Sequence, residues 1–190
     1  MKCLLPLLTA TALASAQPCL ADSDMEIKAN IVNTSCEISL DNNGSINLGT
    51  VSQDYFANNE TPDDILSGGQ TFYVKVKNCA PVGGTIPSKM TIHFAPLSGS
   101  LSPYSNQVFA NEDATGPQNV GVVIFSTHDA QNIVNVMNTD GTPRSVYDVT
   151  PADYTGVNYS FYARMQKIVA AQPVTGGGVK ASVLVSVYYE

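Results

Sequence analysis

The feature that most restricts the fold of this chain is an alternation of apolar and polar residues with a period of two. It is clearest near the end of the chain, where the apolar positions are Val179, Ala181, Val183, Val185, Val187 and Tyr189. A period of two is typical of a β-strand with one buried face. No stretch has a convincing helical repeat of 3.6 residues. The pattern therefore predicts an all-β fold.

Further short strands are predicted, each bounded by Gly, Pro, Asn or Asp. They lie at residues 25–31, 46–48, 72–76, 90–94 and 161–164. Residues 119–126 are almost continuously apolar, which predicts a central strand buried on both faces. Two stretches rich in Asn, Asp, Ser, Gly and Pro, residues 52–69 and 98–117, predict long loops. About seven or eight short strands in one domain suggest a β-sandwich of the immunoglobulin type.

The beginning of the chain predicts a secretory signal peptide over residues 1–21. Lys2 supplies a positive charge, residues 4–13 are apolar, and small residues follow. Cleavage after Ala16 or after Ala21 fits this pattern.

The cysteine count favours cleavage after Ala21. That cut removes Cys3 and Cys19 and leaves two cysteines, Cys36 and Cys79, whereas the earlier cut would leave Cys19 unpaired. Exported proteins enter an oxidising compartment, so a Cys36–Cys79 disulfide is predicted. Closing a loop of about 43 residues would contribute on the order of 4 kcal/mol to stability.

Charge and composition exclude several classes of function. The net charge of −7 is the wrong sign for binding nucleic acid or an anionic membrane surface. No apolar stretch after the signal peptide is long enough to span a membrane as a helix. His93 and His128 have no nearby ligand pattern, so neither a metal nor another cofactor is predicted. Ser126 and Asp129 flank His128 without a Gly-x-Ser-x-Gly motif, and an enzyme is not expected.

Several stretches together resemble the subunits, or pilins, of chaperone–usher fimbriae of the type 1 pilus family in Gram-negative bacteria. The matching stretches are residues 22–36, 119–124, 161–165 and 173–176, which resemble the N-terminal extension, the central strand, the penultimate strand and its turn. Gly177 is fourteenth from the end and Tyr189 is next to last, as in the C-terminal signature of that family. Ala29 stands where many members have Gly.

The resemblance implies an incomplete immunoglobulin-like β-sandwich that lacks its final strand and is completed by donor-strand complementation. A periplasmic chaperone would fill the open groove first, and at the outer-membrane usher the extension of the next subunit would replace it. The implied organisation is a signal peptide at residues 1–21, a donor-strand extension at 22–34 and a pilin domain at 35–190.

The resemblance also assigns two sets of residues. The donor face of the extension would be Met25, Ile27, Ala29 and Ile31. The groove edge that the chaperone contacts would comprise Gly177, Val183, Val185, Val187 and Tyr189. The implied function is a structural fimbrial subunit, exported through the periplasm to the cell-surface fimbrium, with neighbouring pilins as partners. The short extension is more like that of a minor or adaptor subunit.

One alternative to the pilin interpretation remains open. The alternation at residues 25–31 is also compatible with an ordinary first strand of a self-contained sandwich. Such a protein would act without polymerising, as an exported adhesin or carbohydrate-binding protein.

Overall fold

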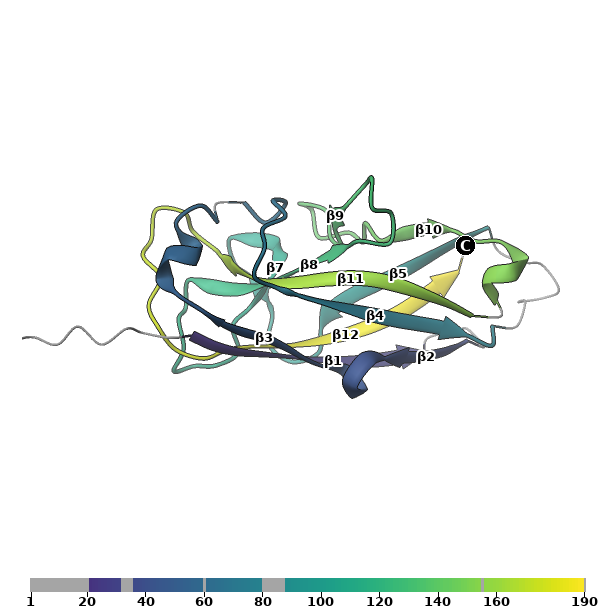
Figure 1. The fold of residues 1–190 in the computed structure, drawn as a ribbon, viewed down its shortest axis with the longest axis horizontal. Helices are drawn as coiled ribbons and strands as arrows, with labels where there is room; N and C mark the ends of the chain where they lie inside the picture. Colours follow the sequence, from purple (N-terminus) through teal and green to yellow (C-terminus); the bar gives the residue numbers. More distant parts are fainter. Residues whose placement is uncertain (1–20, 32–35, 60, 80–87, 155, 190) are drawn as a thin grey trace, which may run out of the picture.

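A computed structural model describes residues 21–31, 36–59, 61–79, 88–154 and 156–189 of the chain (Figure 1). These residues form two facing β-sheets and contain no α-helix. The strands are β1 (Ala21–Ile31), β2 (Glu37–Leu40), β3 (Ser45–Val51), β4 (Gln70–Lys77), β5 (Lys89–Pro96), β6 (Leu101–Ser102), β7 (Ser105–Ala110), β8 (Val120–Ser126), β9 (Val134–Asn135), β10 (Val146–Asp148), β11 (Gly156–Lys167) and β12 (Val179–Tyr189). The predicted all-β fold of immunoglobulin type is confirmed.

The first sheet has the strand order β10-β5-β12-β1-β3. β5 and β12 are antiparallel, as are β1 and β3, but β1 and β12 run in the same direction. Figure 1 shows β1 and β12 extending together toward the end of the molecule that carries the C-terminus. The last strand along the chain therefore lies beside the first described one.

The second sheet has the order β2-β4-β11-β8-β7-β6, with β9 also paired to β8. Its central strand β8 is buried along its whole length, as its continuous apolar sequence predicts. The core lies between the two sheets, where the rings of Phe94 on β5 and Phe161 on β11 meet with centroids 4.8 Å apart. Phe72 on β4 stacks on Phe161 from the same sheet.

The prediction of one long loop over residues 98–117 is wrong, because this stretch contains β6 and β7. These strands form a hairpin that extends the second sheet beyond β8. Gln107, Val108 and Phe109 are consecutive buried residues, so their sequence lacks the alternation of a half-exposed strand. Pro103 and Tyr104 form the turn between β6 and β7.

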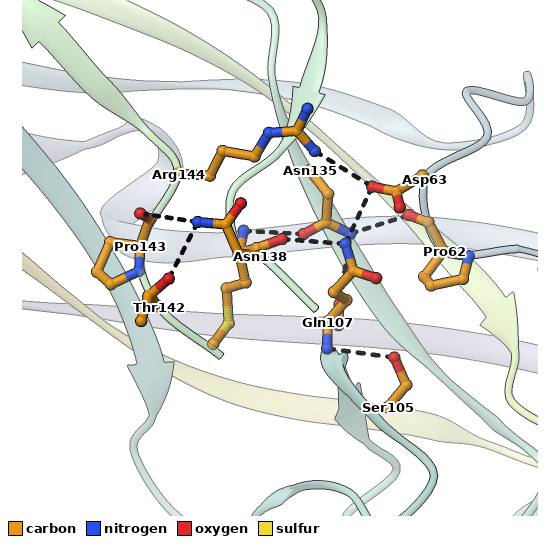
Figure 2. A network of polar contacts seen from close by, with 10 residues as sticks. Pro62, Asp63, Ser105, Gln107, Asn135, Asn138, Thr142, Pro143 and Arg144 are labelled. Atoms are coloured by element: carbon orange, nitrogen blue, oxygen red, sulfur yellow. Dashed lines mark hydrogen bonds and ion pairs between the residues drawn. The ribbon is translucent and has the colours of Figure 1, made fainter. Parts of the chain in front are cut away.

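Residues 57–59 and 61–69 are irregular and lie against the second sheet through side-chain hydrogen bonds (Figure 2). Gln107 Nε2 donates to Asp63 Oδ1 at 3.0 Å, and Asn135 Nδ2 donates to the carbonyl oxygen of Pro62 at 2.9 Å. Arg144 adds an ion pair to Asp63 at 3.6 Å. This part of the predicted loop is therefore held to β7 and β9 by polar side chains.

Arg164 on β11 is fully buried beneath the same segment. Its Nη1 donates to Asn59 Oδ1 at 3.2 Å, while Nη2 donates to the carbonyl oxygens of Thr61, at 3.3 Å, and Asp64. The guanidinium carbon lies 5.4 Å from the centroid of the Phe125 ring, an arrangement suited to a cation–π contact. The fork of the guanidinium thus fixes Asn59, Thr61 and Asp64 over the outer face of the sheet.

Arg164→Lys should lower the free energy of unfolding by about 2 kcal/mol. The ammonium keeps the charge but cannot serve the same spread of acceptors, and hydrogen bonds to charged groups contribute about 1.5–3 kcal/mol. Arg144→Lys is the matched control, because this side chain is 41% exposed and its ion pair should contribute less than about 1 kcal/mol. Urea denaturation of both variants measures the difference, and equal losses would contradict the assigned role of Arg164.

Candidate functional site

The candidate site is the groove between β12 and β3, which β1 fills in this structure. The Cα register with β12 runs from Ser23 opposite Val179 to Ile31 opposite Val187. On its other side β1 pairs with β3, with a bulge at Ser23 and Asp24. Because β1 stands between them, β12 and β3 would each present an unpaired edge without it.

The side chains of β1 alternate between the core and the surface. Met25 and Ile27 are 0% and 1% exposed, and both belong to the main core cluster. Glu26 and Lys28 lie on the outer face, where they form an ion pair of 3.2 Å. Burying the two apolar side chains contributes roughly 3–6 kcal/mol, at about 1.5–3 kcal/mol each. This is a large share of the roughly 5–15 kcal/mol that stabilises a typical domain.

Ala29 and Ile31, the other two residues of the predicted donor face, continue the same strand. Their backbones lie in register with Val185 and Val187, but their side chains are outside the described part of the structure. All four predicted donor residues therefore belong to β1. The sequence implied an extension separate from the pilin domain, whereas here that extension completes the sheet of its own chain.

The predicted groove-edge residues lie on or just before β12. Val183, Val185 and Val187 are fully buried and face the core. Tyr189 is half-buried and is the last residue of the strand. Gly177 precedes the strand and has a φ of 144°, and a β-carbon at this position would lie 2.9 Å from the Cα of Gly116.

The Cys36–Cys79 disulfide is present and lies where β12 ends. The hydroxyl oxygen of Tyr189 is 2.8 Å from Sγ of Cys36 and 2.9 Å from Sγ of Cys79. The disulfide and Tyr189 therefore fix the last residue of β12 to the segments that begin β2 and follow β4.

At the opposite end of β12, the edge that faces away from β1 is held by the side chains of Asn111 and Glu112. Glu112 accepts hydrogen bonds from the backbone N–H of Ser182 at 2.9 Å and from its hydroxyl at 2.8 Å. Asn111 Oδ1 accepts from the N–H of Lys180 at 2.9 Å, and its Nδ2 donates to the carbonyl oxygen of Gly178 at 3.0 Å. Along one edge of β12, the main-chain groups are thus hydrogen-bonded by β5, Asn111 and Glu112. The other edge of β12 pairs with β1.

Gly44 lies directly against the backbone of β1. It has a φ of 83°, and a β-carbon at this position would overlap the carbonyl oxygen of Ile27. The preceding Asn42 and Asn43 also have positive φ values, of 48° and 55°. Glycine is therefore required at Gly44 both by its backbone conformation and by the path of β1.

Ser126 and His128 do not form a nucleophile–base pair. The hydroxyl of Ser126 lies 2.7 Å from that of Tyr147, and the His128 ring packs against the rings of Tyr147 and Tyr159. Burial raises the pKa of Tyr147 and of Tyr159 well above their usual range, so both phenols remain protonated. The rings of His128, Tyr147 and Tyr159 therefore pack together as an aromatic cluster.

The described residues show neither a metal-binding cluster nor a membrane-spanning helix. No group of three or more His, Cys, Asp or Glu residues there is placed to hold a metal ion. No helix in that part of the chain is long and apolar enough to cross a membrane.

Residues 25–190 match the family described as Fimbrial protein. The chain belongs to this family. This fimbrial protein is also similar to the "Uncharacterized fimbrial-like protein YadK" of Escherichia coli (strain K12). The two are 44% identical over 176 residues, which cover 92% of this chain and 89% of the relative.

Among solved structures, the fimbrial protein has a weak similarity to the CupB6 tip adhesin from Pseudomonas aeruginosa. The TM-score is 0.42 and the sequence identity 12%, over 77% of this chain. The chain spans 42% of the length of that adhesin.

Membership of the family confirms the resemblance to chaperone–usher fimbrial subunits. Proteins of this family are exported and assembled into surface fimbriae, so this chain is a fimbrial protein of the cell surface. The family is one of structural proteins, which points to a non-enzyme.

Sequence reasoning missed Gly44, Asn111 and Glu112 as parts of the groove. Nothing in the sequence indicates that Gly44 lies against Ile27. Asn111 and Glu112 fell within a stretch predicted to be loop. Their contacts join residues about 70 positions apart, as with Glu112 and Ser182, and no local pattern reports such a pair.

Ile27→Ala should lower the free energy of unfolding of the isolated chain by about 2–5 kcal/mol, as expected for truncating a buried aliphatic side chain. Lys28→Ala, the neighbouring change on the exposed face, should alter it by less than about 0.5 kcal/mol. Urea denaturation of the chain from residue 22 onward measures both values. If Ile27→Ala were as mild as Lys28→Ala, β1 would not occupy the groove in solution.

Proposed function

We propose that this chain is a structural pilus subunit that polymerises by donor-strand exchange. In this process β1 leaves the groove of its own subunit and fills the groove of a neighbouring subunit. The vacated groove is filled by β1 of another subunit. The observation that carries the proposal is the position of β1 between two sheet edges, with Met25 and Ile27 buried among core residues. A strand added in this way gains affinity from main-chain hydrogen bonds and specificity from alternate side chains.

The exchange requires partners that protect the empty groove. Without a strand, β12 and β3 would expose main-chain groups beside a row of valines that includes Val183, Val185 and Val187. An open apolar sheet edge of this kind is prone to aggregate. We therefore infer that a periplasmic chaperone pairs with β12 before assembly and that an outer-membrane usher directs its replacement by the next subunit.

Export precedes these steps. Residues 1–20 lie outside the described residues, so the signal peptide and its cleavage after Ala21 remain predictions. With that cleavage, fourteen residues precede Cys36. This short extension is the basis for proposing a minor or adaptor subunit in preference to the main subunit of the rod.

Ile27→Asp should block incorporation into fibres while leaving capture by the chaperone intact. A carboxylate at this position would be buried among apolar side chains in the neighbour's groove, at a cost of several kcal/mol. The chaperone supplies its own strand to the groove and does not use Ile27. Co-expression with a fimbrial chaperone and usher, followed by isolation of surface fibres, measures incorporation.

Lys28→Asp is the control for that experiment, because the same carboxylate would lie on the exposed face. It should enter fibres at the level of the unaltered chain. Normal fibres from Ile27→Asp would remove Ile27 from the donor face and would contradict the proposed exchange.

A further inference from the structure

The direction of β1 restricts how two copies could be joined by exchanging it. β1 and β12 are parallel, so the last residue of β1, Ile31, lies at the same end of the sheet as Val187. Tyr189 and the Cys36–Cys79 disulfide lie at this end as well. We call it the disulfide end, and we call the opposite end, where Val179 and Gly177 lie, the loop end.

The link from β1 to the rest of the chain is short. Five peptide steps separate Ile31 from Cys36, and a fully extended chain of that length spans roughly 17 Å. Wherever β1 is placed, its last residue must therefore stay within about 17 Å of the disulfide end of its own subunit.

Exchange in the direction seen here would bring two disulfide ends together. A β1 seated parallel to the β12 of another copy emerges at the disulfide end of that copy, and its short link must then reach the disulfide end of its own subunit. A reciprocal exchange fills both grooves and closes a two-fold dimer. Open head-to-tail growth instead requires the disulfide end of one copy to meet the loop end of the next.

We infer that a second copy of this chain binds at the disulfide end when β1 is exchanged in the parallel direction, forming a closed two-fold dimer. This inference rests on the proposed exchange of β1. The alternation of β1 is compatible with both directions, because residues two apart share a face whichever way the strand runs. Met25 and Ile27 can thus face the core in either case.

Cross-links between paired cysteines distinguish the two directions. In the parallel register Asp24 lies opposite Lys180 and Lys28 opposite Leu184, so D24C/K180C and K28C/L184C are the matched pairs. A reversed strand can retain at most one of these two pairs. The crossed pairs, D24C/L184C and K28C/K180C, are the controls, because in the parallel register their partners are separated by about 13 Å along the strand. A disulfide requires Cα atoms within about 7 Å.

The experiment uses the chain from residue 22 onward, prepared in light and isotopically heavy forms. The two forms are refolded together at high concentration without chaperone, oxidised mildly, separated by size and analysed by mass spectrometry. We expect a dimer fraction in which half of the molecules are light–heavy hybrids, cross-linked through both matched pairs and through neither crossed pair. No ladder of longer species should appear.

Three results would overturn the inference. The first is a ladder of trimers and longer species cross-linked through both matched pairs, which would support exchange but not closure. The second is a dimer without light–heavy cross-links at the matched pairs, and the third is a chain that stays monomeric at every concentration. Failure of the proposed function is distinguished separately, because it would appear as the absence of fibres from the unaltered chain with chaperone and usher.

Discussion

The five-stranded sheet depends on a strand standing between β12 and β3. That strand satisfies the main-chain groups of both neighbours and places Met25 and Ile27 in the core between the sheets. The free energy gained by burying these two side chains is a large share of the stability of an ordinary domain. The strand is joined to the remainder of the chain by a short link and lies beside the last strand along the sequence. It is therefore both essential to the fold and, of the strands described, the one closest to the beginning of the chain.

The surroundings of the groove are fixed by contacts that do not involve β1. β5 pairs with one half of β12, Asn111 and Glu112 hold the other half, and Tyr189 anchors its last residue at the disulfide. These contacts restrict the conformation of the edge that a strand entering the groove would meet, which reduces the entropic cost of binding. Arg164 plays a comparable part on the outer face of the second sheet, where it holds Asn59 and Thr61 in place.

Much of the fold could be predicted because its signals are local. Alternation revealed β12, a continuous apolar run revealed β8, and the cysteine count gave the disulfide. The remainder depended on contacts between distant residues. Arg164 alternates with apolar neighbours as an exposed residue would, and only the segment covering it explains its burial. The hairpin of β6 and β7 was not predicted, because the three consecutive buried residues of β7 do not follow the alternation of a half-exposed strand. The direction of β1 could not be predicted at all, since a period of two reads the same from either end.

The most direct test of this account is to remove β1 and supply it again as a peptide. A chain beginning at residue 32 would be refolded alone, with a synthetic peptide of residues 21–31, and with the same peptide carrying Ile27→Asp. Circular dichroism during urea denaturation reports cooperative unfolding in each case. The account predicts a cooperative transition only with the unaltered peptide, and aggregation or partial structure otherwise. A stable monomer that unfolds cooperatively without any peptide would show that the sandwich is complete without β1 and would contradict the account.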